Sequence, residues 1–70
     1  MEIALKAKKI RDRVIYAFNV IPQNIDIKRH VVYVEIRQKD IDRLKLDVTA
    51  IEKSLELLLD RRVEVKKIDE

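Results

Sequence analysis

The stretch from residue 40 to residue 60 constrains the fold most, because it carries the longest regular apolar pattern in the chain. Its apolar side chains recur at steps of three and four residues, which places them along one face of a helix. They are Ile41, Leu44, Val48, Ile51, Leu55 and Leu58. Charged residues occupy most of the other positions, so the pattern predicts an amphipathic helix that buries one face against a small core.

The capping signals leave open whether this stretch is one helix or two. Asp40 is the predicted N-cap of a continuous helix. Asp47 and the capping-box pattern from Thr49 to Glu52 instead indicate a second helix that begins near residue 47 or 49, after a short helical turn over 41–45. The apolar pattern runs through without interruption, and on that ground we predict one continuous helix.

A second helical pattern covers residues 2–20 and predicts the first helix of the chain. Pro22 ends this helix, because proline has no amide donor and restricts the residue before it. The predicted apolar face consists of Ile3, Ala7, Ile10, Val14, Ala17 and Ile21, with Phe18 beside it.

Residues 25–37 alternate between apolar and polar side chains and predict a β-hairpin. A turn centred on Arg29 and His30 brings the apolar residues of both strands to one face, as a sheet with a single buried face requires. The resulting pairs are Ile27 with Val32 and Ile25 with Val34. Because Arg29 and His30 are not the Asn or Gly that tight turns favour, we predict a looser loop with the same register.

Residues 62–68 also alternate and predict the last strand. The order is therefore α-β-β-α-β, a single α+β domain over residues 1–70. We predict a two-layer α/β sandwich, with two helices on one face of a three-stranded sheet. Pairing of the last strand with 25–28 or with 31–37 stays open. The predicted core consists of Ile10, Val14, Phe18, Ile27, Val32, Val34, Ile36, Leu44, Val48, Ile51, Leu55, Leu58, Val63 and Val65.

The composition limits the origin and the compartment of this 70-residue chain. It contains no cysteine, which fits a reducing compartment and a cytoplasmic location. The 16 Lys and Arg residues and 13 Asp and Glu residues leave a net charge of only +3, and this density of both charges is typical of thermophile proteins. It also contains no glycine, which excludes Gly-rich phosphate loops and raises a designed or minimised scaffold as one possible origin.

Two groups of basic residues are candidates for contacts with phosphate. Lys8 and Arg11 belong to the densest basic run, in the predicted first helix. The second group surrounds the start of the 40–60 helix, where Asp40 and Asp42 lower its positive potential. It consists of Arg37, Lys39, Arg43 and Lys45. A charged helix surface exposed to water would also explain both groups without any ligand.

Several strings occur here in the order found in a known family. They are Val-Val-Tyr-Val at 31–34, the apolar helix that runs to Leu59, and Arg-Arg-Val-Glu-Val at 61–65, with Pro22 in an earlier link. Together they resemble a type II KH domain, similar to those of archaeal NusA-like and cleavage-factor proteins. The resemblance covers roughly residues 10–68 and implies a module that binds single-stranded RNA.

The Gly-x-x-Gly loop that defines the KH family is absent. It would fall at residues 45–48, where side chains obstruct the approach of a nucleic-acid backbone and Asp47 adds an acid. The resemblance therefore implies weak binding, through attraction of phosphate and with little base readout. The residues that would contact phosphate are Arg37, Lys39, Arg43 and Lys45.

Self-association is the alternative interpretation. The ring-building modules of secretion and flagellar basal-body proteins share the α-β-β-α-β order and bind no nucleic acid. A homodimer through a sheet edge, or through the face that carries Tyr33, is the corresponding expectation here. We expect no catalysis, because acid pairs such as Glu52 and Glu56 are predicted on exposed helix flanks. We also expect no metal, cofactor or small-molecule substrate. No membrane span is expected either, because no apolar run approaches the roughly 20 residues that one requires.

Overall fold

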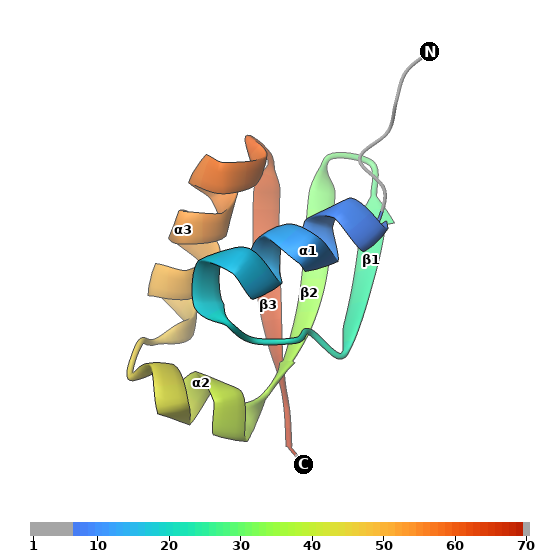
Figure 1. Ribbon diagram of the computed structural model, residues 1–70. Coiled ribbons are helices and arrows are strands. Elements are labelled where there is room, and N and C mark those ends of the chain that lie inside the picture. Colours follow the sequence, from blue (N-terminus) through green and yellow to red (C-terminus); the bar gives the residue numbers. More distant parts are fainter. Residues whose placement is uncertain (1–6, 70) are drawn as a thin grey trace.

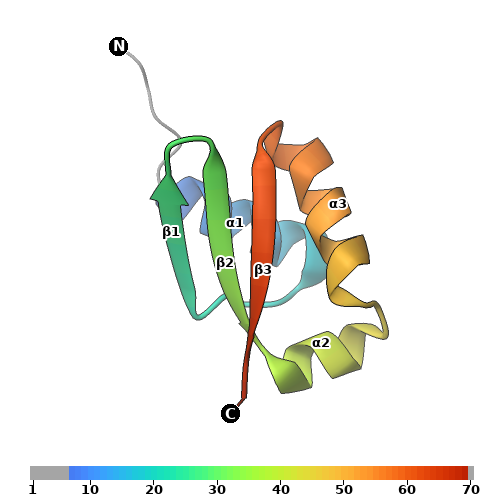
Figure 2. The same ribbon diagram turned by 180° about the vertical axis from the view of Figure 1, so that it is seen from behind.

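The computed structural model describes residues 7–69 and has the predicted α+β fold with the order α-β-β-α-β, in which the second helical element consists of two helices. Helices α1 and α3 lie on one face of the sheet, and α2 lies across the end where β2 finishes (Figures 1 and 2). The elements are α1 (Ala7–Phe18), β1 (Asn24–Lys28), β2 (Val31–Arg37), α2 (Gln38–Leu44), α3 (Val48–Leu59) and β3 (Arg62–Ile68). The predicted helical residues before Ala7, Ile3 among them, lie outside the described residues.

The sheet has the strand order β1-β2-β3, with β2 in the centre. Strands β1 and β2 are antiparallel, and the predicted register is confirmed, since Ile27 pairs with Val32 and Ile25 pairs with Val34. Strand β3 runs parallel to β2. The chain reaches β3 through α2 and α3, because a parallel neighbour needs a long crossover connection. This pairing answers the question that the sequence left open.

The core is a single aliphatic cluster between the sheet and the helices. Its members are Ile10, Val14, Val20, Val32, Val34, Ile36, Ile41, Ile51, Leu55, Leu59, Val63 and Val65, and the partly buried Phe18, Ile25, Leu44 and Val48 pack against them. Two predicted core residues are exposed, Ile27 by 36% and Leu58 by 42%. Ile27 lies on an edge strand. Leu59, only 6% exposed, lies in the core where Leu58 was predicted.

The prediction of one continuous helix over 40–60 is wrong, because α2 ends at Leu44 and α3 begins at Val48. The 12 residues of α3 span about 18 Å, which fits beside the seven-residue strands, each about 23 Å long. One helix from residue 38 to residue 59 would be about 33 Å long. It would project beyond the sheet, and its apolar face would lack cover there.

Non-glycine residues with positive φ make the sharp turns of this glycine-free chain. They are Asn19 (57°), Arg29 (50°), Lys45 (59°) and Asp60 (55°). Lys45 and Asp60 are the C-caps of α2 and α3, a position where helices commonly place glycine. Asn19 plays the same part after α1, which therefore ends at Phe18, well before Pro22. Asn and Asp tolerate this conformation better than Arg and Lys do.

The hairpin turn is tighter than the sequence predicts. Lys28 pairs directly with Val31, so Arg29 and His30 form a two-residue turn instead of the predicted looser loop. Only Arg29, the first of the two, has a positive φ. Type II′ turns have positive φ at that position and place glycine there. The apolar alternation of the two strands therefore outweighs the local preference of the turn residues.

Candidate nucleic-acid interface

Asp40 is the centre of the charged cluster at the start of α2. Its side chain, only 12% exposed, accepts a hydrogen bond from Arg37 Nε at 3.2 Å, and Arg43 lies 3.6 Å from its other oxygen. Asp40 lies in the first turn of α2 and is not the N-cap, contrary to prediction, because the helix begins at Gln38. A carboxylate in a first helical turn is favoured by the helix dipole. The cluster thus has a structural reason to exist.

Arg43 connects this cluster to the end of α1. Its guanidinium donates a hydrogen bond to the backbone carbonyl of Asn19 at 3.1 Å. The side chain stays 56% exposed while it bridges Asp40 and Asn19. The two arginines predicted to attract phosphate are therefore partly neutralised, and both help to hold α2 against its neighbours. The signal for this was the spacing of Arg37, Asp40 and Arg43 at steps of three, which is the spacing of ion pairs on a helix.

Lys39 and Lys45 are the freer cations of the predicted site. Both are exposed, and neither forms an ion pair within the described range 7–69. Lys45 is the positive-φ residue that ends α2, and it is exposed at the start of the link between the two helices. These two lysines are better placed to attract a phosphate than Arg37, whose side chain is only 30% exposed.

The link between α2 and α3 ends in a capped helix N-terminus. The Asp47 side chain accepts a hydrogen bond from the Ala50 amide at 3.0 Å, as the two-helix interpretation of the sequence indicated. Helix N-termini attract phosphate through free amides and the helix dipole. Here the carboxylate of Asp47 already occupies that position. The helix–link–helix geometry is present, but its natural anion site holds an acid.

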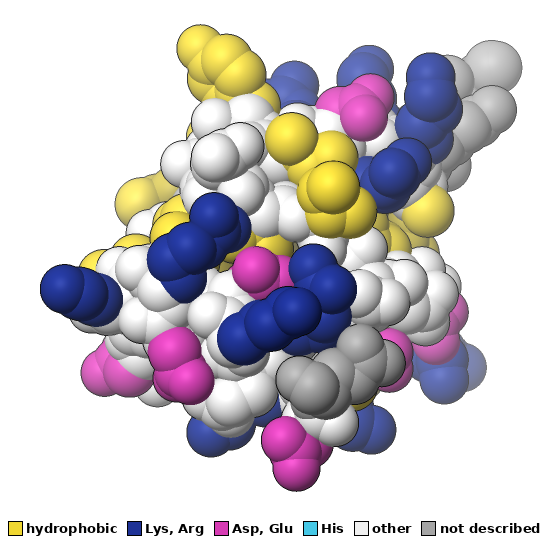
Figure 3. Space-filling model, turned by 60° about the horizontal axis from the view of Figure 1, so that its bottom comes forward, with side chains coloured by type: hydrophobic (Ala, Val, Ile, Leu, Met, Phe, Trp, Pro, Cys, Tyr) yellow, Lys and Arg dark blue, Asp and Glu magenta, His cyan; other side chains and the backbone are white. Residues whose placement is uncertain are grey.

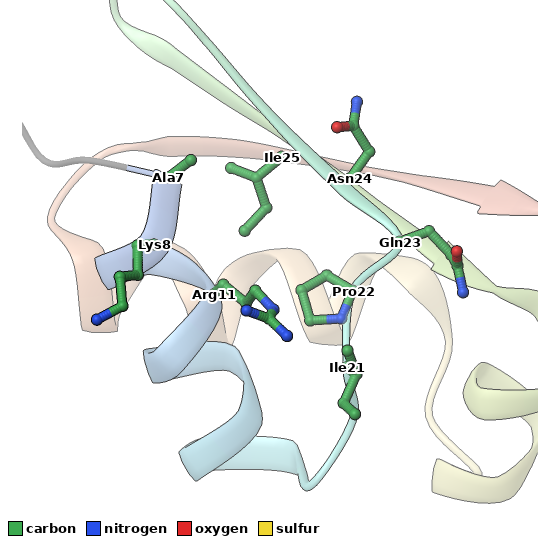
Figure 4. A pocket seen from close by; sticks show the side chains of 8 residues that line it. All are labelled: Ala7, Lys8, Arg11, Ile21, Pro22, Gln23, Asn24 and Ile25. Atoms are coloured by element: carbon green, nitrogen blue, oxygen red, sulfur yellow. The ribbon is translucent and has the colours of Figure 1, made fainter.

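Lys8 and Arg11 lie on a different surface from the α2 cluster. Both are exposed on α1 and line a pocket of about 350 Å³ between α1 and the segment that leads into β1 (Figure 4). Ile21, Pro22 and Ile25 supply its apolar wall. Among the described residues no hydrogen bond or ion pair joins Lys8 or Arg11 to the α2 cluster.

On the face that Figure 3 shows, the charged surface is mixed and does not form one continuous basic patch. Figure 3 shows Lys and Arg side chains in separate groups, with Asp and Glu among them and hydrophobic surface between. Such a surface attracts phosphate weakly, because nearby acids lower the local potential. The predicted basic residues are all exposed or partly exposed, but the fold does not gather the six of them into one site.

Two acids that the sequence suggested were exposed instead close one edge of the sheet. Glu56 accepts a hydrogen bond from the Val63 amide at 3.2 Å, and Glu52 accepts one from the Val65 amide at 2.8 Å. Both glutamates are half-buried on α3. Their spacing of four residues places them on one helix flank, which matches alternate outward amides of β3. Only the parallel pairing of β3 with β2 turns these amides toward α3.

His30 is exposed, and Tyr33 is half-buried. His30 lines a hollow of about 490 Å³ with Asp60, Arg61 and Arg62, where the hairpin turn meets the turn before β3. Tyr33 is half-buried on β2 and alternates with the buried Val32 and Val34, so its side chain lies on the opposite face of the sheet. The helices leave that face uncovered (Figure 2). Its neighbours across the strands are Asp26 and Glu64. Tyr33 therefore lies between two acids in the sheet.

Within residues 7–69 no group of three or more His, Asp or Glu side chains could hold a metal ion. None of the helices in this range is long and apolar enough to cross a bilayer. Comparison of the chain with protein-family models, with curated proteins and with solved structures finds no match.

Proposed function

We propose that this chain is a weak, KH-like module that binds single-stranded RNA along α2, the 45–47 link and the start of α3. One observation carries the proposal: the helical region is interrupted at 45–47, where the KH family has the loop that meets the nucleic-acid backbone. The parallel pairing of β3 with β2 and the antiparallel β1 complete a compact support for that link. A cytoplasmic location would suit such a module.

Phosphate attraction by Lys39 and Lys45 is the proposed mechanism, with a smaller part for Arg43. Both lysines are exposed and unpaired in the described part of the chain, whereas Arg37 and Arg43 share Asp40. Asp47 opposes binding, because its carboxylate accepts the hydrogen bond of the Ala50 amide at the helix start where a phosphate would bind. The expected affinity is therefore low and strongly dependent on salt, with little preference for sequence.

The test is a titration of labelled single-stranded RNA at about 50 mM and about 200 mM salt, a range over which phosphate-driven binding weakens sharply. The double variant Lys39→Ala/Lys45→Ala should lower the affinity and reduce the salt slope by about 1.4, since each single-strand phosphate contact contributes about 0.7. Lys53→Ala/Lys66→Ala, which removes the same charge from α3 and β3, is the matched control. Equal losses in both pairs would mean only general attraction, and no binding at low salt would refute the proposal.

A gain-of-binding variant tests the mechanism in the opposite direction. Asp47→Asn keeps a side chain that caps helices well but removes the negative charge from the link. RNA affinity should then rise, with unchanged stability. An unchanged affinity would show that RNA, if bound, does not approach the start of α3.

A different observation favours self-association: no side chain in the described range bonds to the outer backbone groups of β1. Self-association does not compete with RNA binding, because β1 and the 45–47 link belong to different parts of the fold (Figure 1).

A further inference from the structure

The two edges of the sheet are protected very differently. At β3, the Val63 and Val65 amides donate to Glu56 and Glu52 of α3. At β1, no described side chain donates to or accepts from the outer backbone groups. An edge strand with free amides and carbonyls is a template for another strand unless something blocks it. Within residues 7–69, β1 is therefore the edge whose outward backbone groups have no side-chain partner.

The hairpin geometry identifies which backbone groups of β1 are free. Lys28 and Val31 flank a two-residue turn, and residues in that position exchange both hydrogen bonds. Bonded pairs then alternate along the ladder, so Asp26 and Asn24 also point their backbone groups toward β2. The amides and carbonyls of Ile25 and Ile27 consequently point outward, to the free edge of the sheet.

The side chains of β1 provide both faces of an interface. Ile27 is 36% exposed on the helix side of the sheet, although it belongs to the apolar face of the hairpin. On the opposite face Asp26 and Lys28 lie side by side, with their charged groups 3.6 Å apart and mostly exposed. The strand thus offers an apolar residue between an acid and a base, with no proline or bulky block within residues 24–28.

We propose that a second copy of this chain pairs antiparallel with β1 across a two-fold axis, so that two three-stranded sheets become one six-stranded sheet. The register places Ile27 opposite Ile27 of the second copy. Asp26 then lies opposite Lys28 of the second copy, and Lys28 opposite its Asp26. Opposite charges directly across a strand pair stabilise it, whereas like charges destabilise it.

Charge decides against the register with the largest overlap. Centring the pair on Asp26 would place two aspartates directly opposite each other, at the closest spacing that strands allow. Shifting the pair to Ile27 replaces that contact with two Asp–Lys contacts and keeps every isoleucine on the helix side, because the shift preserves the alternation of faces. The outward amide and carbonyl of Ile27 meet those of the second copy, as a two-fold axis requires.

The interface is small, so the expected dimer is weak and forms only at high protein concentration. Sedimentation equilibrium over a wide concentration range measures it directly, and a mass that stays monomeric throughout would overturn the proposal. Amide exchange gives a second readout. Protection of the Ile27 amide should increase with concentration, while that of the Val65 amide, already bonded to Glu52, should not.

Charge exchange tests the register. Asp26→Lys alone and Lys28→Asp alone each place like charges opposite each other and should weaken association at least about threefold, because each dimer loses two favourable pairs. The double exchange on one chain restores both pairs and should restore the dimer. Asp26→Asn should weaken the dimer as well; a stronger dimer would show instead that two aspartates face each other and would overturn the register.

Ile27→Pro tests the edge itself, because it removes the outward amide without touching a bond to β2. It should abolish association and leave the circular dichroism spectrum of the protein unchanged. Tyr33→Asp changes the uncovered sheet face instead and should leave association intact. Loss of the dimer in Tyr33→Asp, but not in Ile27→Pro, would assign the interface to the sheet face and overturn the proposal. Neither change affects the 45–47 link, so RNA binding should persist in both variants.

Discussion

The two edges of this sheet show how one chain treats equivalent backbone in opposite ways. The edge formed by β3 is closed by Glu52 and Glu56, and its Val63 and Val65 side chains are buried beneath α3. The edge formed by β1 has no such contact among the described residues, and most of its side chains are exposed. Strand pairing alone does not protect an edge; here the protection comes from a neighbouring helix that supplies acceptors at the right spacing.

The largest expected difference is in core packing, between α3 at the closed edge and β1 at the other edge. Leu55→Ala, in a fully buried residue of α3, should lower the free energy of unfolding by about 2–5 kcal/mol because it leaves a cavity. A domain of this size has roughly 4–10 kcal/mol in total, so the variant should be close to unfolded. Ile27→Ala on β1 should cost less than about 1 kcal/mol, because the side chain is already partly in water. Urea denaturation measures both, and equal losses would contradict the comparison.

Next in size is the loss of one acceptor at the closed edge. Glu52→Ala leaves the Val65 amide without its partner and should cost about 1–3 kcal/mol, with faster exchange of that amide. Glu52→Gln keeps an acceptor and should cost less. The control is Lys53→Ala, an exposed neighbour on the same helix, which should be close to neutral. If Glu52→Ala is no worse than Lys53→Ala, the side chain does not protect the edge.

Weakening the start of α3 should loosen the closed edge selectively. Asp47→Ala removes the bond to the Ala50 amide and should cost about 1 kcal/mol in the free energy of unfolding. Asp47→Asn should keep the stability within a few tenths of a kcal/mol, since asparagine caps helices equally well. In Asp47→Ala, hydrogen exchange should show less protection of the β3 amides than in the unmodified chain. A similar loss at β1 would indicate global unfolding instead of local loosening.

The smallest expected effect concerns the turns that lead out of β1 and into β3. Arg29→Gly should raise the free energy of unfolding by about 0.5 kcal/mol. Relief of positive φ is worth about 1–2 kcal/mol for an ordinary residue, and the added chain entropy of glycine removes about 0.5–1. Asp60→Gly should gain less, because aspartate tolerates this conformation. Thermal denaturation of the two variants compares them, and a larger gain at Asp60 would reverse the expected order.

The candidate site was less predictable than the fold. All the basic residues named from the sequence are on the surface, but the structure ties Arg37 and Arg43 to Asp40. Lys39 and Lys45 form no ion pair with any described residue. Sequence spacing indicates which charges share a helix. It does not show how deeply an acid between them is buried, because burial depends on elements from elsewhere in the chain.

Local periodicity alone determined the three strands, the two helical regions and the hairpin register, because alternation in a strand assigns each side chain to one face. The residue types of the sequence also supplied the capping signal at Asp47, although an uninterrupted apolar pattern outweighed that signal in the prediction. Only the tertiary structure decided that the helix breaks at 45–47, since the break depends on the length of the sheet that α3 must cover. The same holds for the parallel placement of β3 and for the closure of its edge by Glu52 and Glu56. These features depend on contacts between distant segments, and periodicity within one segment carries no information about its neighbours in space.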